Sequence, residues 1–343
     1  MRLLYPLLKI IGAWPDPAVT TVSSTIIKWC TISISYFLQL LLLIPSFMYI
    51  FGKETNSRKQ VKLLMPHING LSQLIKYTIL LRRMKEFRET MEDIRNDWLS
   101  ATDENRQIFR ENAKVGYKSY FVFFDAQRTP NYEIIFALQV LGGFVIYTIL
   151  CGTMGVSSLL CMHMCSLLRI LANMMSELSE QLDVSENAVQ KKIASIVEYR
   201  TKIKKFLNNV EEITPYICCF EIINDTLITC AIGYCIIMEW ESSNTAALIV
   251  YISLQMSTIF INFTMCYIGQ LLINESEHIS RTSATLNWYR FSSKKARCLI
   301  PVIIISNYRI KITAAKILEV SLATFTDIMK ASMGYLNVLR SAL

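Results

Sequence analysis

An all-α bundle of membrane-spanning helices is the fold that this sequence of 343 residues predicts. Apolar residues make up 52% of the chain and charged residues only 18%, whereas a soluble domain carries about a quarter charged residues. The basic residues that produce the net charge of +8 stand in short blocks between long uncharged runs. This arrangement is typical of a polytopic protein surrounded by membrane lipid, and it argues against a nucleic-acid partner.

Six segments are expected to cross the membrane. Three of them contain uncharged runs longer than the roughly 20 residues that span about 30 Å of hydrocarbon as a helix. Two further apolar segments contain lone ionisable residues, which a membrane helix tolerates when they face the interior of a bundle. An amphipathic segment closes the chain. The expected spans are at about 29–51, 63–81, 134–160, 213–238, 245–274 and 314–341.

The charges of the connecting segments predict the orientation of these spans. Residues 169–212 and 275–311 each carry seven Lys and Arg residues, whereas 239–244 carries none. Because basic loops stay in the cytoplasm, the N-terminus is expected inside and the C-terminus outside. The segments 82–114, 169–212 and 275–311 are expected to be cytoplasmic helical extensions, since 82–114 and 169–212 place opposite charges three and four residues apart.

One crossing is missing from this arrangement. The basic segment 82–114 should lie inside and residues 125–133 should lie outside, yet only 115–124 separates them. Ten residues with Lys118 among them cannot span a bilayer as a helix. Either 82–114 lies outside against its charge or a helix is absent from this chain, and we favour the absent helix.

Catalytic and metal-binding chemistry is not expected. The chain holds only three histidines, and on a helix His163 points about 200° away from Cys161, so the Cys161–Cys165 cluster cannot close on one ion. We predict no enzyme, no cofactor and no metal. A G-protein-coupled receptor is a distant alternative, because that class needs the opposite orientation.

The last predicted helix carries one polar stripe. Its members fall within an arc of roughly 100° on a helical wheel. Such a stripe needs a wet or polar surface to face, which is either a pore formed by several copies of the helix or a polar seam inside one bundle. The stripe consists of Asp327, Lys330, Gly334, Asn337, Val338 and Ser341.

Three stretches of the sequence are similar to those of insect odorant receptors. The beginning at 4–15 reads LYPLLKIIGAWP, and residues 129–135 read TPNYEII, which resembles the entry to that family's fourth helix. The end reads LEVSLATFTDIMK at 318–330 and GYLNVLR at 334–340, which resembles the family's final helix. Nearly the whole chain fits the pattern, and the phrasing is closest to that of hymenopteran receptors.

The resemblance implies a seven-helix subunit with its N-terminus inside. It also implies a heterotetramer with a shared co-receptor subunit, forming a cation channel that odorants open in the plasma membrane of olfactory sensory dendrites. The last helix would line the pore, and the hydrophobic gate maps onto Val338 and Ala342, where the family usually has a larger residue than alanine. The third helix of the family is the one that this chain lacks.

The resemblance further implies an odorant pocket in the outer half of the bundle. Apolar walls with a few polar groups suit small volatile ligands. The alternatives are a gustatory-type receptor channel of the same fold, which acts without the co-receptor, and a truncated receptor that does not function. The candidate pocket residues are His67, Leu71, Phe136, Val140, Phe144, Tyr147, Tyr251 and Gln255.

Overall fold

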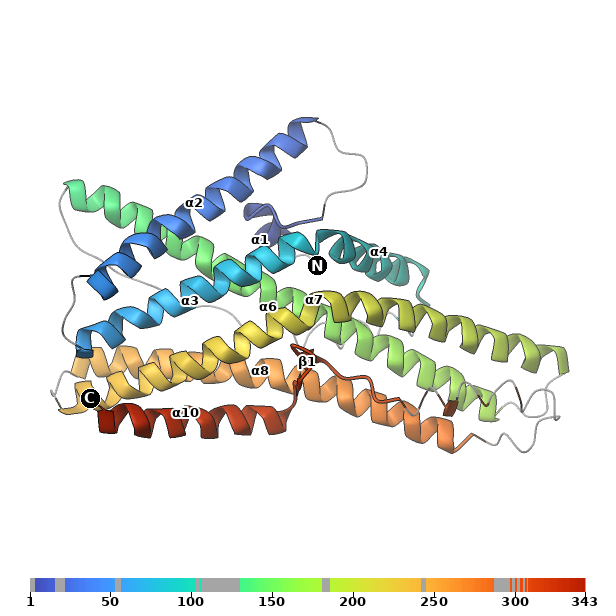
Figure 1. Ribbon diagram of the computed structural model, residues 1–343. Helices are drawn as coiled ribbons and strands as arrows, with labels where there is room; N and C mark the ends of the chain where they lie inside the picture. Colours follow the sequence, from blue (N-terminus) through green and yellow to red (C-terminus); the bar gives the residue numbers. More distant parts are fainter. Residues whose placement is uncertain are drawn as a thin grey trace.

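A computed structural model shows an elongated bundle of long helices (Figure 1). It describes residues 4–15, 22–52, 57–102, 130–180, 186–241, 245–286 and 308–342, together with 105, 297, 300, 303, 304 and 306. Apart from one short hairpin, the regular structure in these ranges is helical, so the all-α fold class is confirmed. The elements are α1 (Leu4–Ile10), α2 (Val22–Gly52), α3 (Ser57–Arg82), α4 (Met84–Ser100), α6 (Pro130–Glu180), α7 (Glu186–Glu241), α8 (Thr245–Ala284), β1 (Thr313–Ala314), β2 (Leu318–Glu319) and α10 (Leu322–Ala342).

Four of the described helices are long and apolar enough to cross a membrane. They are α2, α6, α7 and α8. The helices α3 and α10 cover the other two predicted spans but are more polar, since α3 contains Lys62 and Lys76 and α10 contains Asp327 and Lys330. The number of spans and the orientation of the termini therefore remain predictions.

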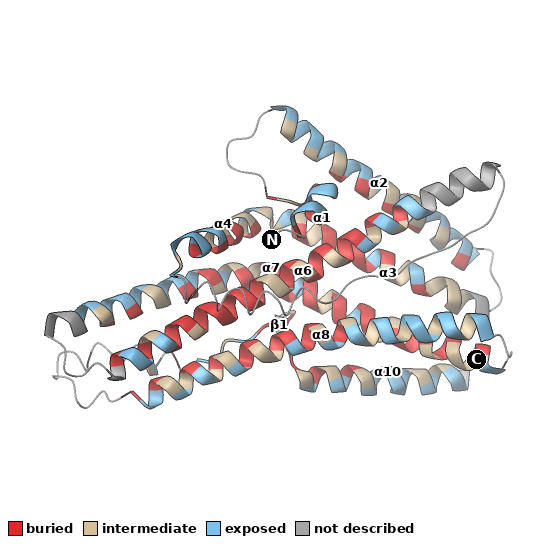
Figure 2. Ribbon diagram, turned by 180° about the vertical axis from the view of Figure 1, so that it is seen from behind, coloured by how far each residue is buried: buried red, intermediate tan, exposed pale blue. Residues whose placement is uncertain are grey.

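The three central helices are much longer than a membrane requires. The helix α6 has 51 residues, α7 has 56 and α8 has 40, against roughly 20 for one crossing. They run side by side into the segments predicted to be cytoplasmic extensions, and α4 packs on α7 there (Figures 1 and 2). Polar contacts to the buried Asp97 of α4 stabilise this region. Oδ1 of Asp97 accepts a hydrogen bond from Lys202, and its Oδ2 lies 3.0 Å from Nε2 of His163.

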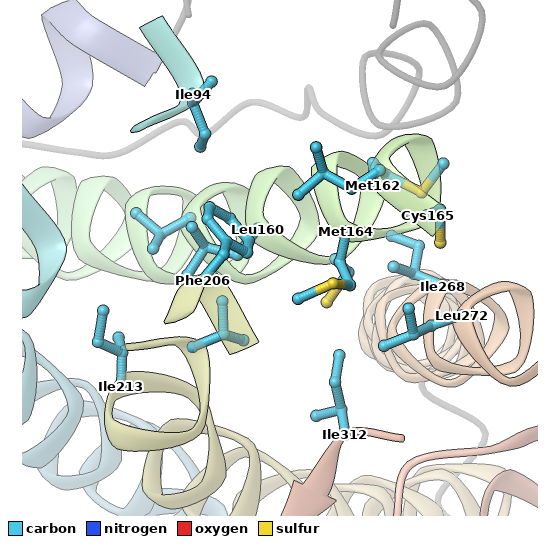
Figure 3. Close-up of a cluster of buried hydrophobic side chains, with 14 of the residues drawn as sticks. Ile94, Leu160, Met162, Met164, Cys165, Phe206, Ile213, Ile268, Leu272 and Ile312 are labelled. Carbon is cyan, nitrogen blue, oxygen red and sulfur yellow. The ribbon is translucent and has the colours of Figure 1, made fainter. Parts of the chain in front are cut away.

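The largest apolar core lies where α6, α7 and α8 meet (Figure 3). Leu160 and Met164 of α6 face Phe206 of α7 and Leu272 of α8, and Ile312 closes the cluster next to β1. Flexible methionines fill irregular gaps in such a core.

The predicted span at 314–341 begins eight residues too early, since α10 starts at Leu322. Residues 313–319 instead form an antiparallel hairpin, whose turn places Ala315 and Lys316 at positive φ (50° and 63°). The N–H of Ala315 donates to the carbonyl oxygen of Pro215 in α7 at 2.9 Å. The spacing of the apolar residues in this stretch suits a helix as well as a hairpin. In the structure, Ala314 and Val320 are buried.

Two local features fix the junction between the hairpin and α10. The Oγ of Ser321 accepts a hydrogen bond from the N–H of Thr324, which is how a serine caps the start of a helix. Gly269 of α8 gives the chain room to pass, since a Cβ at this position would lie 2.2 Å from the carbonyl oxygen of Val320. The segment 115–124, on which the expected absence of a helix rests, lies outside the described residues.

Candidate functional site

The last helix packs against its own bundle through one narrow side. Ile328 and Ser332 are buried, and the Oγ of Ser332 approaches the carbonyl oxygen of Thr226 in α7 at 3.4 Å. One turn further along, Leu336 lies over Gly233, where an added Cβ would be only 3.2 Å away. On the other flank, the ring of Phe325 meets Phe263 of α8 edge to face, with centroids 5.6 Å apart. The helix α10 is therefore held by α7 and α8.

The polar stripe of α10 faces away from this contact. The side chains of Asp327 and Lys330 are 72% and 75% exposed, and no atom outside the helix lies within 4 Å of a Cβ added at Gly334. Within the described part of the chain, the stripe does not face the bundle, so no polar seam is formed there. Asn337, Val338 and Ser341 are exposed on the same face, and Ala342 ends the helix with a side chain outside the described set.

Asp327 and Lys330 form an ion pair within the helix. The Nζ of Lys330 lies 4.0 Å from Oδ1 of Asp327, one turn away on the exposed face. An ion pair of this kind contributes only about 0–1 kcal/mol to stability. The position of the pair matters more than its energy, because it places a cation and an anion side by side on the exposed face of α10.

Three of the eight predicted pocket residues are partly buried. His67 of α3 packs beside Phe47 of α2, with ring centroids 5.8 Å apart, and its buried Nδ1 has no hydrogen-bond partner among the described residues. Tyr251 of α8 packs against a small cluster that includes Cys235 of α7. In the same described part of the chain, the buried Oε1 of Gln255 also has no hydrogen-bond partner. Unpaired polar atoms between apolar walls are suited to orienting a small ligand.

The other predicted pocket residues are not gathered around these three. Leu71, Val140, Phe144 and Tyr147 are all between 44% and 55% exposed, and the side chain of Phe136 lies outside the described set. They could enclose a ligand only with a further element over them. An open apolar hollow does lie on α2, but none of the predicted residues lines it. Its lining is Thr25, Ile26, Trp29, Cys30, Ser33 and Ile34.

A buried ionic cluster lies between the helices. Lys76 of α3 donates to Oε2 of Glu221 in α7, and both side chains are almost fully buried. The expectation that lone ionisable residues of these spans face the bundle interior is confirmed for this pair and for Asp225. Sequence analysis did not pair them, because 145 residues separate the partners and only the packing of α3 on α7 brings them together.

The packed bundle and its four long apolar helices define a multi-pass helical membrane protein. The family model described as "7tm Odorant receptor" matches residues 106–333, which is well over half of the chain. The chain therefore belongs to the insect odorant receptor family, as its resemblance to that family predicted. It is a receptor and not an enzyme.

Individual relatives agree with this assignment. Odorant receptor 13a of Drosophila melanogaster is 22% identical over 247 residues, which is 67% of this chain and 58% of that protein. The match thus spans little more than half the length of this relative. The solved olfactory receptor OR5 from Machilis hrabei, in complex with eugenol, superimposes with a TM-score of 0.75 at 12% identity, over 100% of this chain and 97% of that chain. Its structure described without eugenol gives 0.73 at 12% identity, over 98% and 96%.

Proposed function

We propose that this chain is an odorant receptor subunit that binds small volatile ligands and forms an odorant-gated cation channel with a shared co-receptor. The observation that carries the proposal is the exposed polar stripe of α10. A polar face on a membrane helix needs water or polar groups opposite it, and four such helices around an axis supply both. In this arrangement Val338 and Ala342 form the apolar constriction at the outer end of the pore.

The proposed pocket is built on α3 and α8, and the exposed predicted residues of α6 join it only with a further element over them. His67, Tyr251 and Gln255 supply its polar atoms, while the aromatic and aliphatic predicted residues supply apolar surface. Burial of a volatile ligand contributes about 25 cal/mol per Å² of apolar area. A ligand opens the channel only to the extent that it binds the open state more tightly than the closed one. We place the subunit in the plasma membrane of sensory dendrites, with its N-terminus inside and its C-terminus outside.

The experiment is voltage clamp of cells that express the chain with a co-receptor, under a broad panel of volatile compounds. Asn337→Cys on the stripe is compared with Ser332→Cys, which places the thiol against α7. A charged thiol reagent should reduce the odorant-evoked current in the first variant and leave the second at the level of the native chain. Equal effects on both would contradict the pore assignment.

The same recording separates the alternatives. Currents evoked by soluble tastants without the co-receptor would indicate a gustatory-type channel of the same fold. Retention of the chain inside the cell would indicate a truncated receptor, and surface labelling measures this directly. Surface delivery without any odorant-evoked current would refute the proposed function.

A further inference from the structure

The charged residues of the α10 stripe stand near the end at which that helix begins. Asp327 and Lys330 lie in its first half, whereas the later members of the stripe are glycine, asparagine, valine and serine. A rise of 1.5 Å per residue puts Asp327 about 17 Å from Val338 along the helix axis. The stripe therefore has a charged level and, well separated from it, an uncharged level at the proposed constriction.

Small residues flank the charged level on the exposed face. Ala323 and Ala331 lie four residues before and after Asp327, and Gly334 lies four residues after Lys330, so all three are one turn away. These three residues are exposed, as are the side chains of Asp327 and Lys330 themselves. Both charged groups therefore reach whatever medium fills the space in front of α10.

The medium that suits this face is water. A charged side chain in contact with hydrocarbon is costly, and membrane helices turn such groups toward a water-filled cavity or toward other polar groups. Asp327 and Lys330 do not turn toward α7 and α8, because the contact side of α10 is formed by Ile328 and Ser332. The charged level of the stripe thus fits the wall of an aqueous pore.

The two charges act on a passing ion in opposite directions. The carboxylate of Asp327 attracts cations, whereas the ammonium group of Lys330 repels them, and a divalent cation feels twice the force of a monovalent one. Because Nζ of Lys330 lies 4.0 Å from Oδ1 of Asp327, each charge largely offsets the other for an ion further away. Removal of either partner therefore exposes the full charge of the other.

We propose that Asp327 and Lys330 jointly set the charge selectivity of the channel, with Asp327 favouring cations over anions and Lys330 limiting the permeability to divalent cations. This inference rests on the proposed function, because it requires α10 to line an aqueous pore. Each copy of the chain in the assembly contributes one such pair. The effect of a substitution is therefore read against the native chain with the same co-receptor.

The test is the reversal potential of the odorant-evoked current under voltage clamp. Dilution of external sodium chloride gives the chloride-to-sodium permeability ratio, and its replacement by calcium chloride gives the calcium-to-sodium ratio. Asp327→Asn leaves the ammonium group alone and should raise the chloride-to-sodium ratio. Lys330→Gln leaves the carboxylate alone and should raise the calcium-to-sodium ratio. We expect each change to be about two- to fivefold.

Three further variants separate charge from structure. The double variant Asp327→Asn with Lys330→Gln removes both charges together and should bring both ratios back toward those of the native chain. Lys330→Arg keeps the cation and should leave both ratios at the native values. Arg340→Gln is the matched control for Lys330→Gln, since Arg340 is another exposed cation of α10 but lies outside the stripe. It should also leave both ratios unchanged.

Native reversal potentials in both single variants would overturn this inference alone, because the odorant-evoked current itself would still support the proposed function. Equal shifts in Arg340→Gln and Lys330→Gln would overturn it too, since the effect would then not depend on the stripe. A native chain that gives no odorant-evoked current would refute the proposed function and this inference with it. If Asp327→Asn does not reach the cell surface, the calcium-to-sodium ratios of Lys330→Gln and Lys330→Arg still decide the question.

Discussion

Lys76 of α3 and Glu221 of α7 form an ion pair that is 0% and 1% exposed, between helices that are far apart in the chain. Each charge depends on the other for its stabilisation, because neither side chain reaches solvent. A buried pair of this kind contributes little net stability over apolar side chains of similar size, but breaking it leaves an uncompensated charge. The packing of α3 against α7 therefore depends on both residues.

Lys76→Met should therefore destabilise the protein strongly. It leaves two buried carboxylates without their cation, and we expect a loss of about 3–5 kcal/mol, seen as a lower unfolding midpoint and poor surface delivery. Lys311→Met is the matched control, because Lys311 pairs with Glu319 and the two side chains are 46% and 39% exposed, so its loss should be about 0–1 kcal/mol. The double change Lys76→Met with Glu221→Leu should recover part of the loss. Equal effects of the two single changes would contradict this account.

Gly269→Ala tests the close approach of the hairpin to α8. The new Cβ would overlap the carbonyl oxygen of Val320, which is backbone and cannot rotate away. We expect a loss of about 1–3 kcal/mol in unfolding free energy. Gly143→Ala in α6 meets no atom within 4 Å and should be neutral or stabilise by up to about 1 kcal/mol. A Gly269→Ala protein as stable as the native chain would show that the hairpin is loosely placed.

Val338→Ser tests the constriction of the proposed pore. Val338 is 66% exposed on the stripe of α10, and a hydroxyl there favours wetting of an apolar gate. We expect a several-fold larger current in the absence of odorant, recorded with the co-receptor present. Met333→Ser is the control, since Met333 is equally exposed on α10 but lies outside the stripe. An increased resting current in both variants, or in neither, would argue against the assignment.

Asp97→Ala tests the polar contacts that join α4 to α6 and α7. The carboxylate of Asp97 accepts a hydrogen bond from Lys202 of α7 and contacts Nε2 of His163 in α6, so its removal takes a buried polar contact from both groups at once. We expect α4 to be released, with faster backbone hydrogen exchange over residues 84–100 and a loss of about 2–3 kcal/mol. Glu92→Ala, on the exposed face of α4, should leave the exchange rates unchanged. Protection of α4 that survives Asp97→Ala would show that apolar contacts alone hold it.

Sequence reasoning predicted the helices well where an apolar run or a charge stripe marks them. The runs of α2, α6 and α8 and the polar face of α10 follow from composition and periodicity alone. The hairpin at 313–319 did not, because its apolar spacing fits a helix as well as inward-facing turns. The pairing of Lys76 with Glu221 depends on which faces of α3 and α7 meet, and that is a property of tertiary packing. The pocket is the least predictable part, since Leu71 and Phe144 lie on the surface and only the placement of other elements could reveal it.

The hydrogen bond from Ala315 to Pro215 attaches the hairpin to the long helix α7. A straight helix of 56 residues is about 84 Å long, so a tilt of about 5° at one end displaces the other by about 7 Å. The hairpin bonds to this helix at Pro215, where the helix lacks one internal hydrogen bond. The same hairpin leads directly into Ser321 and the first turn of α10. The hairpin thus ties α7 at Pro215 to the first turn of α10, so the placement of one helix depends on the placement of the other.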